Sequence, residues 1–121
     1  MSVALALTLA AEDARRIEAA LVVMAVAAAA THCGVRPEDV YTFAPKTRKD
    51  FGLRLNRARD MAVALLHTAA GMTQKNAGAW FAMTEDSTRQ AVKRSGDLRD
   101  EDPDVESLFA DCEAAIARLT G

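Results

Sequence analysis

Helical spacing of apolar residues, interrupted by short polar breaks, is the feature that most constrains the fold of this chain. Between residues 59 and 94, apolar positions recur at intervals of three and four, as on the buried face of a helix. Gly71 and the segment 83–86 interrupt the spacing, and Thr73 and Thr84 stand where N-caps are expected. This pattern predicts the end of a long helix and then two further helices, joined by tight turns.

The two helices after Gly71 differ in what they are expected to face. In the first, Ala77, Trp80 and Phe81 are predicted to point inward, as core residues rather than as a platform for stacked bases. In the second, the predicted exposed face carries Ser87, Arg89, Gln90, Lys93 and Arg94. Short polar side chains at a helix start, followed by basic ones, are what a recognition helix in a DNA major groove requires.

The composition bounds the chain to one small helical domain. Of its 121 residues, 50% are hydrophobic but only 5% are aromatic, and alanine supplies much of the remainder. No two-residue alternation persists, so we predict an all-α fold of about six helices in a single compact domain over residues 11–121. The apolar residues 1–10 lack the basic region of a secretory signal, and are expected to be disordered or to pack against a second copy.

The first long helix is predicted from Glu12 to His32, with Gly34 ending it. Its inward stripe is expected to comprise Ile17, Leu21, Met24, Ala25 and Ala28. The opposite face is also apolar, with Val22, Val23 and Val26. Such a helix is either wrapped by other elements or shared with another protomer, so a homodimer through this helix is one expectation. Its apolar run is too short for a membrane span, and no membrane partner is expected.

The remaining elements are predicted from their start and stop signals. Pro37 opens a short helix, and residues 46–57 form a basic connecting loop pinned by Phe51, Leu53 and Leu55. The helix-turn-helix segment spans about 73–95. Ser95 and Gly96 are expected to end its second helix. Asp102 and Pro103 then start an acidic amphipathic helix over about 103–119.

Charge is distributed very unevenly along the chain. Residues 46–94 contain ten basic and four acidic side chains, which gives +6, whereas residues 97–113 contain eight acidic side chains and one arginine, which gives −7. The overall net charge of −2 therefore hides a basic segment and an acidic one. Because binding depends on the local field at one face, the basic segment favours a nucleic-acid partner.

The segment 77–88 resembles the signature of the C-terminal DNA-binding domain of the bacterial replication initiator DnaA, Ile-Gly-x-x-Phe-Gly-Gly-Arg-Asp-His-Ser/Thr-Thr. Four positions match it, namely Gly78, Phe81, Ser87 and Thr88. Glu85 conservatively replaces the family's Asp, whereas Asp86 departs from the family's His. Upstream, residues 57–62 look like the family's Arg-Pro-Arg-Gln-x-Ala, and residues 35–40 look like its Val-x-x-x-Asp-Leu. The likeness extends over about residues 14–119.

The resemblance implies a DNA-binding surface. Carried over residue by residue, it makes Glu85, Ser87 and Thr88 base-reading candidates and makes Arg57 and Arg59 DNA-backbone contacts. The family's minor-groove arginine falls on Phe51 here, so that role passes to Arg48, Lys49 or Arg54. The full predicted base-reading set is Glu85, Ser87, Thr88, Arg89 and Gln90. The full predicted backbone set is Arg48, Lys49, Arg54, Arg57, Arg59, Lys75, Lys93 and Arg94.

Two residues at the start of the predicted recognition helix have alternative roles. Asp86 either accepts from a cytosine amine or caps the helix. Arg89 either contacts phosphate or guanine, or pairs with Asp86 one turn earlier. The acids repel phosphate, so binding would depend all the more on nearby cations.

Enzymatic chemistry is not indicated. The chain has no G-x-x-x-x-G-K-[ST] loop, no Ser-His-Asp or Cys-His pattern and no metal-ligand spacing, so we expect no cofactor, no metal and no small-molecule substrate. Cys33 and Cys112 are expected to be ordinary buried thiols.

Three functions are therefore weighed. The first is a stand-alone DnaA-like regulator that binds duplex DNA in a bacterial cytoplasm, at the nucleoid. It is similar to the small activators of gene transfer agent and phage-like clusters, and would work with RNA polymerase or another transcription factor. The second is a helical protein-interaction module that has lost DNA binding. The third is a replication regulator that competes for initiator sites. The presence of Asp86 in place of the family's His disfavours this third function.

Overall fold

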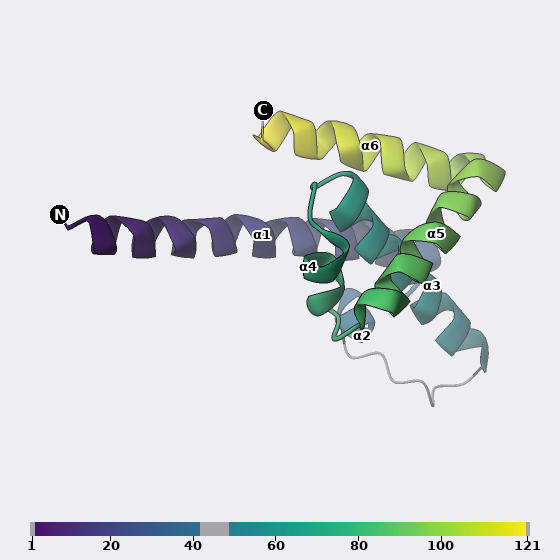
Figure 1. Ribbon diagram of the computed structural model, residues 1–121. Coiled ribbons are helices and arrows are strands. Elements are labelled where there is room, and N and C mark those ends of the chain that lie inside the picture. The colour runs from purple at the N-terminus through teal and green to yellow at the C-terminus, as the bar shows by residue number, and fades with distance from the viewer. Residues whose placement is uncertain (1, 42–48, 121) are drawn as a thin grey trace.

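The computed structural model describes residues 2–41 and 49–120, and the side chains at 49–52 and 119–120 lie outside that description. The described residues form an all-α single domain without a strand (Figure 1). Its helices are α1 (Val3–Cys33), α2 (Pro37–Tyr41), α3 (Lys49–Thr68), α4 (Gln74–Ala79), α5 (Glu85–Glu101) and α6 (Pro103–Thr120). The predicted fold class is confirmed.

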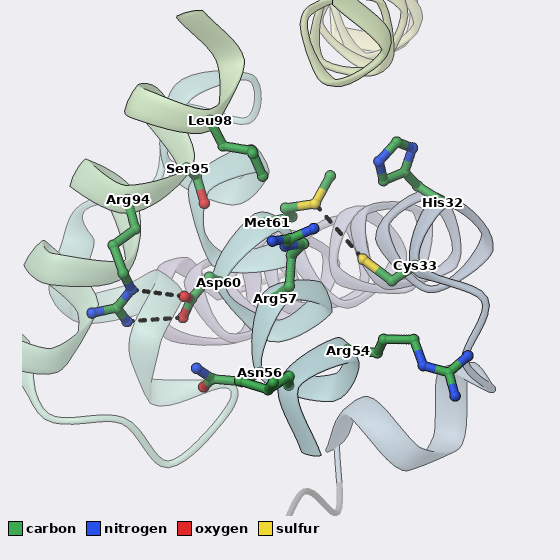
Figure 2. A pocket seen from close by; sticks show the side chains of 11 residues that line it. His32, Cys33, Arg54, Asn56, Arg57, Asp60, Met61, Arg94, Ser95 and Leu98 are labelled. Carbon is green, nitrogen blue, oxygen red and sulfur yellow. Dashed lines mark hydrogen bonds and ion pairs between the residues drawn. The ribbon is translucent and has the colours of Figure 1, made fainter. Parts of the chain in front are cut away.

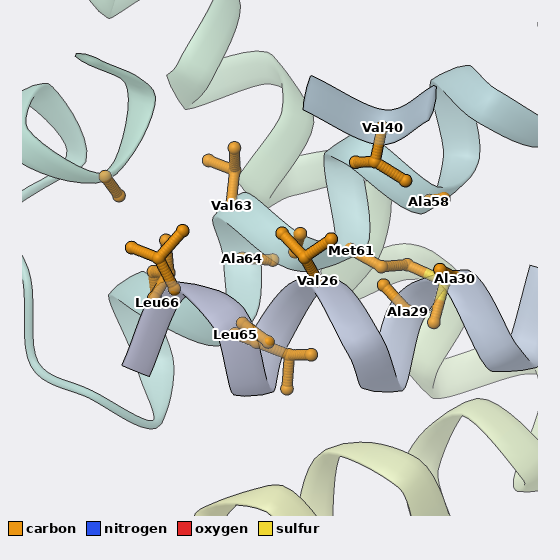
Figure 3. Packing of buried hydrophobic residues seen from close by; sticks show 14 of the residues in the cluster. Val26, Ala29, Ala30, Val40, Ala58, Met61, Val63, Ala64, Leu65 and Leu66 are labelled. Carbon is orange, nitrogen blue, oxygen red and sulfur yellow. The ribbon is translucent and has the colours of Figure 1, made fainter. Parts of the chain in front are cut away.

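Helix α3 lies at the centre of the domain and contacts all five other helices. Every residue from Met61 to Leu66 is at most 1% exposed, so this stretch is buried on all sides (Figure 3). A helix that is apolar all round must be enclosed by other elements. The small side chains of Ala58, Ala62 and Ala64 let the neighbouring helices approach closely, which explains how an aromatic-poor chain builds a core.

Helix α1 is longer than predicted and only half of it belongs to the core. It begins at Val3, where the hydroxyl of Ser2 accepts from the Leu5 N–H, and not at Glu12. It ends at Gly34, as predicted, with φ of 69°. Nothing before that glycine breaks a run of strong helix formers, which explains the extra turns.

Only the C-terminal half of α1 is buried, because its N-terminal half extends beyond the other helices. Leu21, Val22, Ala25 and Val26 are buried, whereas residues 2–17 are all exposed and project away from the other helices (Figure 1). Ile17, predicted to face inward, is 58% exposed, and that prediction is wrong. It fails because helical spacing marks a face but not the length over which that face is covered.

By length and composition α1 could also cross a membrane. Its most apolar window is 33% buried inside the domain. The core helix of a soluble protein passes the same test, so this property is weak support for a membrane span.

The basic segment before the core was predicted as a loop over 46–57, and this is wrong from Lys49 onward, where α3 begins. Residues 46–48 lie outside the described part of the chain. Leu55 is 2% exposed and points into the core, but Leu53 is 62% exposed. Helical geometry separates these two side chains by about 200°, so one faces the core and the other faces solvent.

Helix α5 continues through the predicted break at Ser95 and Gly96. Ser95 is buried against the rest of the domain, so packing of α5 on α3 and α6 offsets the cost of about 1 kcal/mol for a glycine inside a helix. The chain turns instead at Asp102, whose side chain accepts from the Asp104 N–H at the start of α6. The predicted start at Pro103 is confirmed.

Arg99 joins the last two helices. Its guanidinium, on α5, forms ion pairs with Glu106 and Glu113 of α6 and lies 5.2 Å from the centre of the Phe109 ring. The amphipathic character predicted for α6 is confirmed by Val105, Phe109 and Ile116, all buried. The acidic face of α6 is therefore partly neutralised by α5.

Helices α4 and α5 touch at Gly78. A Cβ atom on this residue would clash with Thr88 Oγ1 and would lie 3.0 Å from Thr88 Cβ. Thr88 is fully buried, so it has nowhere to move. Glycine is required here for the close approach of the two helices.

We predict that Gly78→Ala destabilises the domain by about 1–3 kcal/mol, because the added methyl overpacks the α4–α5 contact. The matched control is Gly96→Ala, since Gly96 has open space around its Cβ position and lies within α5. That control is expected to stabilise the domain by about 0.5–1 kcal/mol through helix propensity. Urea unfolding followed by circular dichroism measures both, and equal effects would contradict the packing argument.

Candidate nucleic-acid interface

The turn between α4 and α5 is closed by its backbone. The carbonyl of Gly78 accepts from the N–H groups of Phe81 and Met83, both at 3.0 Å. Phe81 is 7% exposed, and its ring stacks on Tyr41 of α2 with centroids 5.9 Å apart. Ala82 adopts φ of 53°, in the left-handed region. The turn thus reverses the chain tightly while Phe81 anchors it to the core.

Thr73 and Thr84 cap the two helices, as predicted. Thr73 Oγ1 accepts from the Asn76 N–H, and Thr84 Oγ1 accepts from the Ser87 N–H, each at 3.1 Å. The Thr84 hydroxyl also donates to Ser87 Oγ at 2.9 Å. Ser87 is exposed in the first turn of α5, so its own hydroxyl hydrogen can still be donated.

Asp86 organises the exposed start of α5. It forms an ion pair with Arg89, and its other oxygen accepts from Gln90 Nε2 at 3.0 Å. The pairing of Arg89 with Asp86, one of the two roles weighed for it, is therefore present. Glu85 is exposed beside them. Two acids in the first turn also suit the positive end of the helix dipole.

Thr88 does not belong to the exposed face, and its assignment as a base-reading residue is corrected. Its side chain is fully buried and its hydroxyl donates to the Thr84 carbonyl at 2.8 Å. The side chain fills the space above Gly78. In this arrangement Thr88 fixes the angle between α4 and α5, and it cannot reach a base.

Arg94 is tied to α3 by a two-pronged ion pair. Its Nε and Nη2 donate to the two carboxylate oxygens of Asp60 at 2.9 and 3.2 Å (Figure 2). The Asp60 side chain is 8% exposed, whereas that of Arg94 is 52% exposed. The hydrogen bond to Asp60 raises the pKa of Arg94. Arg94 therefore compensates a buried charge first, and only its remaining donors are open to solvent.

Arg59, predicted as a DNA-backbone contact, is half-buried. Its Nη2 donates to Asn56 Oδ1 at 3.0 Å. Burial lowers its pKa; the charge of Asp60 opposes that effect and the charge of Arg94 adds to it. The aliphatic stem of a half-buried arginine contributes packing as well as charge.

The other predicted cations divide into three groups. Arg54, Arg57, Lys75 and Lys93 are exposed on α3, α4 and α5. Lys49 begins α3, but its side chain lies outside the described residues. Arg48 lies outside them entirely. The described interface therefore combines the outer face of α5 with separate cations on α3 and α4.

Trp80 was predicted to point inward, and this is wrong. The side chain is 40% exposed, and its indole N–H donates to Glu18 Oε1 of α1 at 3.1 Å. It stands just past the end of α4, where the helical spacing that supported the prediction no longer applies. Trp80 instead links the turn to α1.

Sequence reasoning missed Asp60 as a structural partner. One signal was present: an acid lies among apolar residues at core spacing, and a buried charge requires compensation. Its partner, 34 positions away on another helix, could not be read from the sequence.

Comparisons with protein-family models, curated proteins and solved structures find no match for this chain.

The left-handed conformation of Ala82 generates a stability prediction. A residue with a Cβ is disfavoured there by about 1–2 kcal/mol, so replacing it with glycine relieves that strain. Part of the stabilisation is offset because glycine loses more conformational entropy on folding. Ala82→Gly should therefore stabilise the domain by about 0.5 kcal/mol. Thermal unfolding measures it, with Ala79→Gly in α4 as a control that should destabilise. A loss of stability in Ala82→Gly would contradict the strained turn.

Proposed function

We propose that this protein binds duplex DNA sequence-specifically and regulates transcription. The observation that supports this best is the presentation of α5. Its inner face, through Thr88, Ala91 and Ser95, is locked into the core, while its first turns and outer face are open. A helix held rigidly by a preceding short helix, with polar residues at its exposed start, suits insertion into a major groove.

The exposed polar and charged side chains have two proposed roles in DNA binding. Lys75, Lys93, Arg54 and Arg57 are exposed and supply phosphate contacts, which give affinity without sequence preference. Ser87, Glu85 and the cluster of Asp86 with Arg89 and Gln90 supply base contacts. Hydroxyl, carboxylate and guanidinium groups together cover both donors and acceptors on base edges.

The finer proposal follows the resemblance of residues 77–88. It is a DnaA-like domain that activates a gene transfer agent or phage-like cluster, acting at the nucleoid in the cytoplasm. RNA polymerase or another transcription factor is the proposed partner for α6. Its exposed acids, such as Asp104 and Asp111, offer a contact surface apart from α5.

We predict that purified protein binds a DNA duplex with steep salt dependence. Lys75→Gln together with Lys93→Gln should weaken binding and reduce the slope of log affinity against log salt by roughly 2, since each phosphate contact contributes about 0.9. Fluorescence anisotropy from low to physiological salt measures both quantities.

A matched double variant controls for the change in net charge. Arg15→Gln with Arg16→Gln removes the same two charges from the exposed part of α1, away from α5. It should leave the salt slope nearly unchanged. Equal losses in the two double variants would mean that binding follows net charge and not this face, and absent binding at low salt would favour the interaction-module alternative.

The exposed half of α1 supports a second part of the proposal, a homodimer. Val3, Leu7 and Ile17 are 77%, 66% and 58% exposed. With the alanines at 10 and 14 they form a stripe at spacings of four and three, continuous with the buried Leu21. This spacing is that of a coiled-coil seam, for which a second copy of the same helix is a suitable cover.

We predict that Leu7→Glu converts a dimer to a monomer, because a charge would be buried in the seam. Leu5→Glu is the matched control, since Leu5 lies on the opposite side of α1 and is also exposed. Sedimentation velocity over a range of concentrations reports the mass. A native protein that stays monomeric throughout, or a control that dissociates equally, would rule out this seam.

A further inference from the structure

A cavity of about 640 Å³ lies between the end of α1, the first half of α3 and the middle of α5 (Figure 2). His32 and Cys33 line it from α1, and Ser95 and Leu98 line it from α5. Its volume falls in the range of small-molecule sites in proteins. The side chains that matter for its chemistry are those of Arg54, Arg57, Asp60, Arg94 and Ser95.

The cavity carries a net positive charge. Its one acid, Asp60, is already neutralised by both prongs of Arg94. Arg54 and Arg57 also line the wall, and neither forms an ion pair with a carboxylate among the described residues. Figure 2 shows the Arg57 side chain between the α1 side and the α5 side of the cavity. Figure 2 also shows the Arg54 guanidinium extending away from that of Arg57, so Arg57 is the cation placed to receive an oxyanion inside this concave site.

A buried hydroxyl supplies a second, independent indication. Ser95 is 2% exposed, and its Oγ has no hydrogen-bond partner among the described residues. In Figure 2 its oxygen points from α5 toward the α3 side of the cavity. Buried polar groups are satisfied in most proteins, and an orphan among cations is explained by an acceptor that arrives with a ligand.

The rest of the wall is apolar. Met61 and Leu98 line the cavity, and the thiol of Cys33 contacts Met61 Sδ at 3.8 Å. Burial raises the pKa of Cys33, against the opposing charge of Arg57, so the thiol is a neutral part of the wall at neutral pH. The site thus joins an anion-binding side to a surface suited to hydrocarbon.

We propose that this cavity binds a small organic anion, with a phosphate or carboxylate head and an apolar body. Arg57 holds the head, the Ser95 hydroxyl donates to it, and Met61 and Leu98 cover the body. This inference does not rest on DNA binding. Arg57 is shared between the two proposals, so bound anion and bound DNA would compete for it.

The test is a titration of the full chain followed by ¹H–¹⁵N NMR at constant ionic strength, with phenyl phosphate and benzoate as probes. Saturable shifts are expected at the amides of Cys33, Arg57 and Ser95, with dissociation constants in the millimolar range or below. Binding of either probe supports the proposal. The probe with the higher affinity shows whether the site prefers a phosphate or a carboxylate head.

Variants assign the binding to the named groups. Arg57→Met keeps the apolar stem and should weaken binding by about tenfold or more, and Ser95→Ala should weaken it by about threefold. Arg15→Met, on the exposed part of α1, should change nothing. Unchanged binding in both cavity variants would overturn the proposal, with helicity by circular dichroism confirming that each variant is folded.

A duplex titration separates this site from the proposed DNA surface. If a DNA duplex shifts the cavity amides while neither probe does so, Arg57 serves backbone phosphate alone and the small-anion site is wrong. If the probes bind and the duplex does not, the cavity stands and the proposed function fails.

Discussion

The burial of α3 on all sides is the constraint on which the rest of this structure depends. Residues 61–66 are enclosed completely, and the other five helices are placed by their contacts with α3. Because most of these residues are small or medium in size, the helix axes come close, and alanine substitutes for the aromatic bulk that this chain lacks. The position of α5, and so of the proposed DNA surface, follows from how α3 is packed.

Two contacts convert that packing into a fixed orientation of α5. Near its start, Thr88 occupies the space that Gly78 leaves free, which sets the distance to α4. In its middle, Arg94 grips Asp60 on α3. The inner face of α5 therefore has little freedom, whereas the outer face keeps exposed side chains that can adjust to a partner. A rigid support beneath adaptable contacts is the arrangement that specific recognition requires.

Local signals in the sequence located several helix ends, but they missed the start of α1 at Val3 and the continuation of α5 through Gly96, and they did not give the environments of single side chains. Thr73, Thr84, Gly34 and Asp102 act on their own backbone neighbours, and each does what its type and position predict. Trp80, Ile17 and Thr88 were misplaced because their burial depends on where helices end and how they pack, which helical spacing alone does not specify. Ile17 lies beyond the reach of the body, Trp80 lies past a helix end, and Thr88 faces a glycine ten positions earlier.

The same limit applies to the candidate sites. The exposure of the basic residues on α4 and α5 could be predicted, because clusters of charged residues can be identified directly in a sequence. The cavity could not, since it is assembled from the end of α1 and from two helices that follow it at a distance. We expected no small-molecule substrate because the sequence contains no known catalytic or small-molecule-binding motif. That reasoning does not bear on the proposed cavity site, because no motif describes a site built from distant residues.

Two of the ion pairs of α5 differ in how easily they could release an arginine to the proposed DNA partner. Asp86 and Arg89 keep 62% and 69% of their side chains exposed, and an exposed pair at this spacing contributes only about 0.2–0.5 kcal/mol. A phosphate or a guanine can therefore take Arg89 from Asp86 at little cost, which leaves the carboxylate to accept from Gln90 or from a cytosine amine. Asp60 is 8% exposed, and removing Arg94 from it would leave a buried charge uncompensated, at a cost of about 3–5 kcal/mol. Arg94 therefore stays with Asp60 and holds the helix in place, while Arg89 can exchange partners, as its proposed role in reading bases requires.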